Sequence, residues 1–137
     1  MLFFAFTIGI HDLFFLILSL VLIVSVYIMF FLLVASISLC SFWLIQVWPL
    51  RPVITAAFLL LGGQSFPLQV LPYSLQWLIY NPFSLAGNQL TLLVLKRLTH
   101  KDVLLDIALS CIWSFILIIT MKLTWTKGLK SYEGVGG

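Results

Sequence analysis

Charged residues are scarce in this chain, and their scarcity indicates its class. Only 8% of the 137 residues are charged while 63% are hydrophobic, and no charged side chain occurs between Asp12 and Arg51 or between Arg51 and Lys96. A soluble domain carries roughly 25% charged residues, which cover its water-facing surface. Because this chain has too little polar surface for that, lipid must be the solvent for most of its outside. The sequence therefore predicts an integral membrane protein.

Motifs for catalysis and cofactor binding are lacking as well. The sequence has no GxxxxGK[ST] loop for nucleotide phosphates, and Cys40 and Cys111 have no CxxC or CxxxH neighbour. Asp102 and Asp106 are explained more simply as acids at the positive end of a helix dipole than as a catalytic pair. The net charge of +3 comes without a polar basic face, which argues against a nucleic-acid partner. We expect no enzymatic activity, no cofactor and no metal site.

The hydrophobic runs predict an all-α integral membrane protein with about three transmembrane helices and a re-entrant or interfacial helical segment between the last two. Residues 13–47 contain neither glycine nor proline and exceed the ~20 residues that a span needs, so they predict one long, tilted helix. We assign the whole chain to a single membrane domain. Its segments are a tail of a truncated span with a turn (1–12), the long transmembrane helix (13–47), a broken transmembrane helix (52–66), the interfacial or re-entrant segment (67–98), a last transmembrane helix (103–125) and a tail (126–137).

A glycine pair interrupts the second hydrophobic run. Gly62 and Gly63 end it, and Pro67 and Pro72 prevent the helix from simply resuming. Irregular backbone at membrane depth survives only where protein or water shields it, which makes these four residues candidates for a gate or hinge. The alternative is tight helix packing, in which glycine serves only through its missing side chain. The sequence leaves both interpretations open.

The segment that follows has the pattern of an interfacial helix. Leu71, Leu75, Leu78 and Ile79 recur at i, i+4, i+7 and i+8, which predicts one apolar stripe on an α-helix. Gln76 lies off this stripe, and Trp77 has the amphipathic ring typical of the membrane interface. We predict a helix that lies in the interface with the stripe turned toward lipid or protein.

Basic residues flank the hydrophobic runs nearly evenly. One group, predicted to be cytoplasmic, comprises Arg51, Lys122, Lys127 and Lys130, and the other comprises Lys96, Arg97 and Lys101. The positive-inside rule favours a cytoplasmic C-terminus only slightly from these counts.

Three short motifs, taken in order, resemble one transporter family. They are Ser41-Phe-Trp43, then the run from Gly62-Gly63 through Phe66-Pro67-Leu68 to Leu71-Pro72, then Asn81-Pro82-Phe83, with a closing pattern around Trp125 and Gly128-Leu129-Lys130. This order and spacing resemble the C-terminal half of permeases of type 2 ABC exporters.

The resemblance implies a multi-pass protein of the cell membrane, the bacterial inner membrane, in contact with lipid. It also implies a separate ABC ATPase subunit that hydrolyses ATP, and a second permease subunit or a missing N-terminal half, because such permeases normally have six spans in a chain about twice as long. The exported compound would be a lipid, a glycan or a hydrophobic compound. The alternative from a different class is a small membrane-anchoring or assembly protein with no transport activity of its own.

Overall fold

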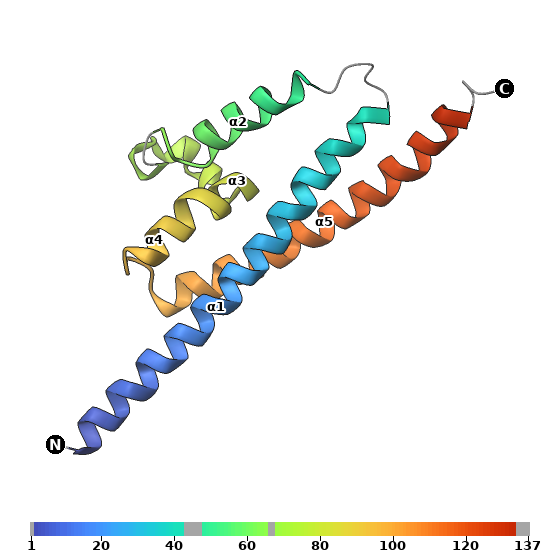
Figure 1. Cartoon of the computed structure of the whole chain (residues 1–137). Coiled ribbons are helices and arrows are strands. Elements are labelled where there is room, and N and C mark those ends of the chain that lie inside the picture. Colours follow the sequence, from blue (N-terminus) through green and yellow to red (C-terminus); the bar gives the residue numbers. More distant parts are fainter. Residues whose placement is uncertain (1, 43–47, 66–67, 134–137) are drawn as a thin grey trace.

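The structure is a computed structural model that describes residues 2–42, 48–65 and 68–133, with side chains for residues 13–41, 48–65 and 68–129. All its regular elements in these ranges are helical (Figure 1). Two long helices form the body: α1 (Leu2–Ser38), which continues as the 3-10 helix η1 (Leu39–Phe42), and α5 (His100–Glu133). The predicted all-α class is confirmed, with two helices long and apolar enough to span a membrane, over Leu13–Ser41 and His100–Leu129.

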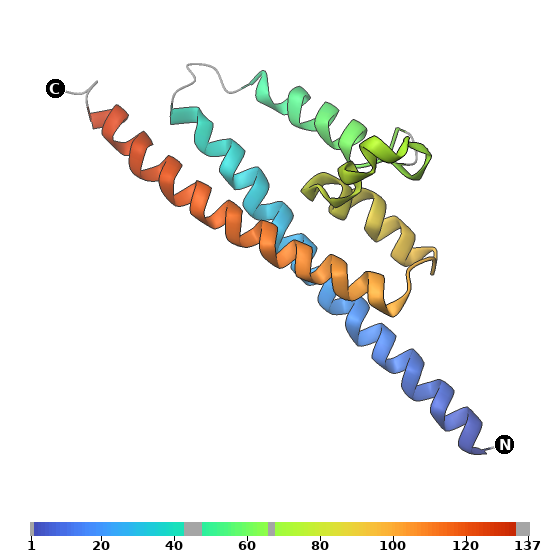
Figure 2. The ribbon, with the colours of Figure 1, turned by 180° about the vertical axis from the view of Figure 1, so that it is seen from behind.

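α1 and α5 run side by side in the same direction (Figures 1 and 2). Near the start of α5, the ring of His100 packs edge-on against Phe15 at 5.1 Å between centroids. About ten residues further along both helices, the Ser110 hydroxyl donates to Oγ of Ser25 at 2.9 Å. Because the contacts advance together along the two sequences, the helices are parallel. The buried apolar core lies along this seam and is made by Leu22, Val26, Met29, Leu85, Leu93 and Val103.

The first turn of α5 is fixed by a capping contact. The backbone N–H of Thr99 donates to Oδ2 of Asp102 at 2.9 Å, which is the return half of a capping box with Asp in the usual Glu position. Asp106, one turn further on, is only 1% exposed and lies in the interior.

Two predicted boundaries are wrong. α1 passes without interruption through Gly9, His11 and Asp12, where a turn was predicted. A single glycine costs a helix about 1 kcal/mol relative to alanine, which is too little to break one so rich in apolar helix-compatible residues. Likewise α5 continues through Gly128 to Glu133, where the sequence predicted an irregular tail, because no proline stops it.

The chain between the long helices is a series of short helices packed on one side of them (Figure 2). α2 (Leu50–Leu61) is followed by two 3-10 helices, η2 (Leu68–Val70) and η3 (Tyr73–Tyr80). A continuous helical run then comprises α3 (Pro82–Ser84), the π-helix η4 (Leu85–Gln89) and α4 (Leu90–Val94). α2 begins at Leu50, two residues before the predicted start, with Pro52 in its first turn, where a missing N–H costs nothing.

Candidate functional site

The backbones of Gly62 and Gly87 touch where α2 ends against the π-helix. A Cβ built on Gly87 would overlap the carbonyl oxygen of Gly62 and lie 3.1 and 3.2 Å from its C and Cα atoms. A Cβ on Gly62 would in turn overlap the Phe58 carbonyl oxygen and lie 3.3 Å from that of Phe83. Real Cβ atoms do not come this close to backbone, so only glycine allows the two segments to approach as they do.

Gly63 terminates α2 for a conformational reason. Its φ is +74°, a left-handed conformation that residues with a Cβ adopt only with strain. A Cβ there would also lie 3.1 Å from Cγ of Leu68 and 3.2 Å from Cβ of Asn88. The glycine pair therefore breaks the helix through both its backbone geometry and its packing. Of the two prolines assigned to the gate, Pro72 precedes η3 in an extended conformation, and Pro67 lies outside the described residues.

The Asn81 side chain links the ends of three helices beside the point where Gly62 and Gly63 end α2. Its Oδ1 accepts from the backbone N–H of Ser84 at 2.8 Å and so caps α3. Its Nδ2 donates to the carbonyl of Leu61, the last residue of α2, at 3.2 Å, and also to the carbonyl of Leu78 in η3. One side chain thus bonds backbone groups at the ends of α2 and η3 and at the start of α3.

The π-helix η4 gathers buried polar groups. Ser84, Asn88 and Gln89 are buried at or next to it, and one polar atom of each has no hydrogen-bond partner. The Thr91 hydroxyl donates to the Gly87 carbonyl at 2.8 Å. Widened π turns leave backbone groups free for such contacts and are frequent at functional sites.

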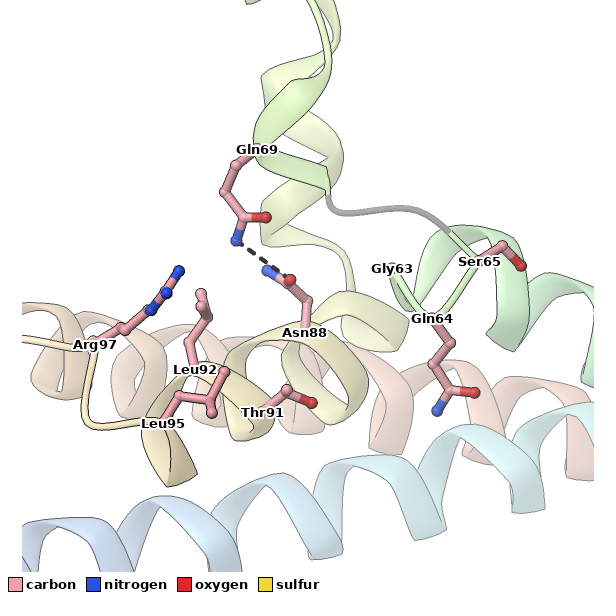
Figure 3. A pocket seen from close by; sticks show the side chains of 9 residues that line it. All are labelled: Gly63, Gln64, Ser65, Gln69, Asn88, Thr91, Leu92, Leu95 and Arg97. Atoms are coloured by element: carbon pink, nitrogen blue, oxygen red, sulfur yellow. Dashed lines mark hydrogen bonds between the residues drawn. The ribbon is translucent and has the colours of Figure 1, made fainter.

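The end of α2 at Gly62 and Gly63 is called the glycine break below. A groove of about 680 Å³ opens between this glycine break, η2 and α4 (Figure 3). The amide of Gln69 donates to Oδ1 of Asn88 at 3.2 Å across it. Figure 3 shows the Arg97 guanidinium on the same side of α4 as the Asn88 amide, both pointing toward Gln69. Six of its nine lining residues have polar side chains and none is a carboxylate: Gly63, Gln64, Ser65, Gln69, Asn88, Thr91, Leu92, Leu95 and Arg97.

The predicted amphipathic α-helix of residues 71–79 is wrong in type. Residues 73–80 form a 3-10 helix, so the α-helical spacing of Leu71, Leu75, Leu78 and Ile79 does not produce one stripe. Leu75 is exposed, whereas Gln76 is half-buried, which reverses the expected order. Pro72 and Asn81 have extended backbone at the two ends of the segment and confine it to the eight residues 73–80.

η3 nevertheless presents amphipathic rings outward. Tyr73 and Trp77 are 90% and 65% exposed. On the other side, the Trp113 indole N–H donates to the Tyr80 carbonyl at 2.9 Å and ties the end of η3 to α5.

The two basic groups lie at opposite ends of the helix pair. Arg51 lies in a cleft with Ser38, and Lys122 in one with Leu39. The other basic group, Lys96, Arg97 and Lys101, lies near His100, whose ring packs against Phe15. Phe15 and Ser38 are about 35 Å apart along α1 at 1.5 Å per residue, close to the ~30 Å of a hydrocarbon core. Lys127 is exposed further along α5, and the side chain of Lys130 is not among those described.

No group of three metal-ligating side chains occurs among residues whose side chains the structure describes, and both cysteines are free. Four residues at or near the site were not assigned to it from the sequence: Asn81, Gly87, Asn88 and Arg97. The Asn81-Pro82 pair and the Gly87-Asn88-Gln89 run were visible as helix breaks. Their partners lie about twenty or more residues away, and single-sequence periodicity does not report contacts at that distance.

In this chain, two parallel apolar helices that are each long enough to span a membrane lie beside a broken helical segment with buried polar side chains. The chain belongs to the ABC-2 transporter family, since the family model described as ABC-2 family transporter protein matches residues 2–136. The resemblance to ABC-2 permeases seen in the sequence is thereby confirmed. Members are membrane transport components, are not themselves catalytic and normally work with an ABC ATPase subunit. Comparisons with curated proteins and with solved structures gave no match.

Proposed function

We propose that this chain forms part of the translocation path of an ATP-driven exporter, with ATP hydrolysed on a partner subunit. The observation that carries the proposal is the family match together with irregular backbone and buried, unpartnered polar side chains between two candidate spans. Unpaired polar groups in lipid are costly, and proteins keep them where they line a path for water or substrate. The compound exported is a lipid, a glycan or a hydrophobic compound, and a second permease subunit or an N-terminal half completes the path.

The direction of α1 and α5 supports a third, composite crossing. Both helices run the same way, so the chain between them must return across the membrane if both span it. α2 alone is about 18 Å long, well short of the ~30 Å hydrocarbon core. The short helices from Leu68 to Val94 would complete that crossing, with the glycine break and the end of η3 near its middle, since Tyr80 accepts a hydrogen bond from Trp113 about halfway between His100 and Lys122.

The break is where this crossing would open. α2 meets η4 through the Gly62–Gly87 contact, and Asn81 joins its last carbonyl to α3. Parting these contacts would move α2 without bending α1 or α5, and would expose the buried polar groups of η4. Gly62 and Gly63 would then act both in packing and as a hinge, because the Gly62–Gly87 contact would form in the closed state and part in the open one.

Two measurements test the proposal. The tagged full-length chain, purified from its own membranes, should retain an ABC ATPase. Inverted vesicles that hold this complex should accumulate a fluorescent phospholipid or hydrophobic dye with ATP, but not when the P-loop lysine of the ATPase is replaced. If the chain instead retains a different complex and no ATPase, it is an anchoring or assembly protein.

A further inference from the structure

Arg97 is held beside the groove by the end of α4. The N–H groups of Lys96 and Arg97 donate to the carbonyls of Leu93 and Leu92 at 2.9 and 3.0 Å, which is the hydrogen-bond pattern of a Schellman turn. Lys96 adopts φ 54° at the position that usually holds glycine. The turn fixes the backbone of Arg97, so its side chain starts from a defined point at the rim of the groove.

The guanidinium of Arg97 has no acidic partner among the side chains that the structure describes. No carboxylate lines the groove, and the nearest acid in sequence, Asp102, accepts from the N–H of Thr99. Two exposed lysines add positive charge nearby, Lys96 on the same turn and Lys101 in the first turn of α5. An unpaired guanidinium within such a cluster attracts an anion.

Asn88 supplies a donor inside the groove. It is 8% exposed, and its Nδ2 has no hydrogen-bond partner, while its Oδ1 accepts from Gln69. A buried donor without a partner costs free energy that a ligand oxygen would recover. Gln69 is exposed on η2, so rotation of its side chain would uncover the Asn88 amide.

The remaining lining matches an amphiphile better than a free ion. Leu92 and Leu95 line the groove next to Arg97, and Val94 is 80% exposed beside them. An apolar wall that continues onto an exposed apolar surface suits an acyl chain. Arg97 also lies at the end of the helix pair marked by His100 and Phe15, roughly one hydrocarbon thickness from Arg51, where headgroups of one leaflet would lie.

We propose that this groove binds the phosphate of an anionic lipid headgroup, with Arg97 as the counter-ion and Asn88 as a buried donor. The planar guanidinium would hold two phosphate oxygens, the Asn88 amide would donate to a third, and the acyl chains would lie along Leu92, Leu95 and Val94. The inference rests on the membrane location that the family gives and not on export. A chain that binds this lipid and exports nothing would overturn the proposed function and leave the site intact.

The test is native mass spectrometry of the purified full-length chain in detergent, titrated with phosphatidylglycerol. Diacylglycerol with the same acyl chains is the control without phosphate. Arg97→Gln should weaken phosphatidylglycerol binding about 10-fold, the effect of one charge-assisted hydrogen-bonded pair, and leave diacylglycerol binding unchanged. Arg51→Gln makes the same change at the opposite end of the protein and should alter neither. Asn88→Ala should weaken phosphatidylglycerol binding by a smaller factor.

Three results would overturn the proposal. The first is equal affinity for the two lipids, and the second is an Arg97→Gln protein that binds phosphatidylglycerol like the wild type. The third is inorganic phosphate that binds as tightly as the lipid and displaces it, which would make the groove a site for a soluble anion. Circular dichroism melts of each variant show whether the fold is intact, and Arg97→Lys, which keeps the charge, should recover part of the binding.

Discussion

The carbonyl oxygen of Gly62 occupies the space where Gly87 would carry a Cβ, so α2 and the π-helix meet backbone to backbone. This contact joins residues 25 positions apart and holds the end of the broken helix against the segment with the buried polar groups. It is the geometric centre of the candidate site, because the groove, the Asn81 junction and the turn of α2 all adjoin it.

Gly87→Ala should therefore disturb the protein more than its single methyl group suggests. Forcing a Cβ into the Gly62 carbonyl requires the two segments to separate, at a cost of about 1–3 kcal/mol for an overpacked contact. Thermal unfolding in detergent measures the effect. Ala56→Val adds more bulk on the exposed face of α2 and should change stability little. Equal melting temperatures for Gly87→Ala and the wild type would show that the contact is not tight.

Alanine at Gly62 and Gly63 does not separate a hinge from a packing contact. By helix propensity alone, two added methyl groups would mainly favour a continuous helix. In the structure, the first overlaps the Phe58 carbonyl and the second stands on a φ of +74°. Both substitutions therefore disrupt packing and conformation together, and Gly87→Ala is the cleaner probe.

The hydrogen bonds that the Asn81 side chain accepts and donates can be tested separately. Asn81→Asp keeps the oxygen that caps α3 and removes the amide that donates to Leu61 and Leu78, whereas Asn81→Ala removes both. We expect the alanine variant to lose about 0.5–2 kcal/mol more than the aspartate variant, the usual value of an N-cap. Chemical denaturation of the two variants gives the difference. If the Asp and Ala variants lose the same unfolding free energy, the cap on α3 contributes nothing and the bonds donated by the Asn81 amide provide all of the stabilisation.

Trp113→Phe should loosen η3 from α5. The substitution keeps an aromatic ring and removes the indole N–H that bonds the Tyr80 carbonyl, at a cost of about 1 kcal/mol. Hydrogen exchange at residues 73–80 should accelerate while exchange along α1 stays unchanged. Trp48→Phe is the matched control, because Trp48 is 87% exposed and far along the chain. Unchanged exchange in η3 would contradict the role of this bond.

Topology is tested by cysteine labelling in a background with Cys40 and Cys111 replaced by serine. Because the two basic groups lie about one hydrocarbon thickness apart along α1, Lys101→Cys and Lys127→Cys should label from opposite sides. In intact cells an impermeant thiol reagent should modify Lys101→Cys and spare Lys127→Cys. The reverse pattern would invert the orientation, and labelling of both would place them on one side.

The sequence was sufficient where composition and local turn chemistry decide the outcome. Scarce charge and long apolar runs predicted the membrane class, and Gly62-Gly63 predicted the end of α2. It failed for the segment between Pro72 and Pro82, which forms a 3-10 helix where the apolar spacing predicted an α-helix.

Contacts between distant segments could not be predicted from the sequence. The Gly62–Gly87 contact, the bond from Asn81 to Leu61 and the burial of Asp106 depend on how separate helices pack. Hydrophobic periodicity within one segment carries no information about such partners.

The distance between α2 and α5 through the ATP cycle tests most directly whether the glycine break moves during transport. Spin labels at Val53→Cys and Leu104→Cys, both exposed on these helices, report it in the cysteine-free chain bound to its ATPase. If the glycine break is the moving junction of an exporter, ATP should shift the distance distribution by several ångströms, and Gly87→Ala should alter that shift while the complex still assembles. Identical distributions with and without ATP, in a complex that hydrolyses ATP and transports, would contradict a moving junction at the glycine break.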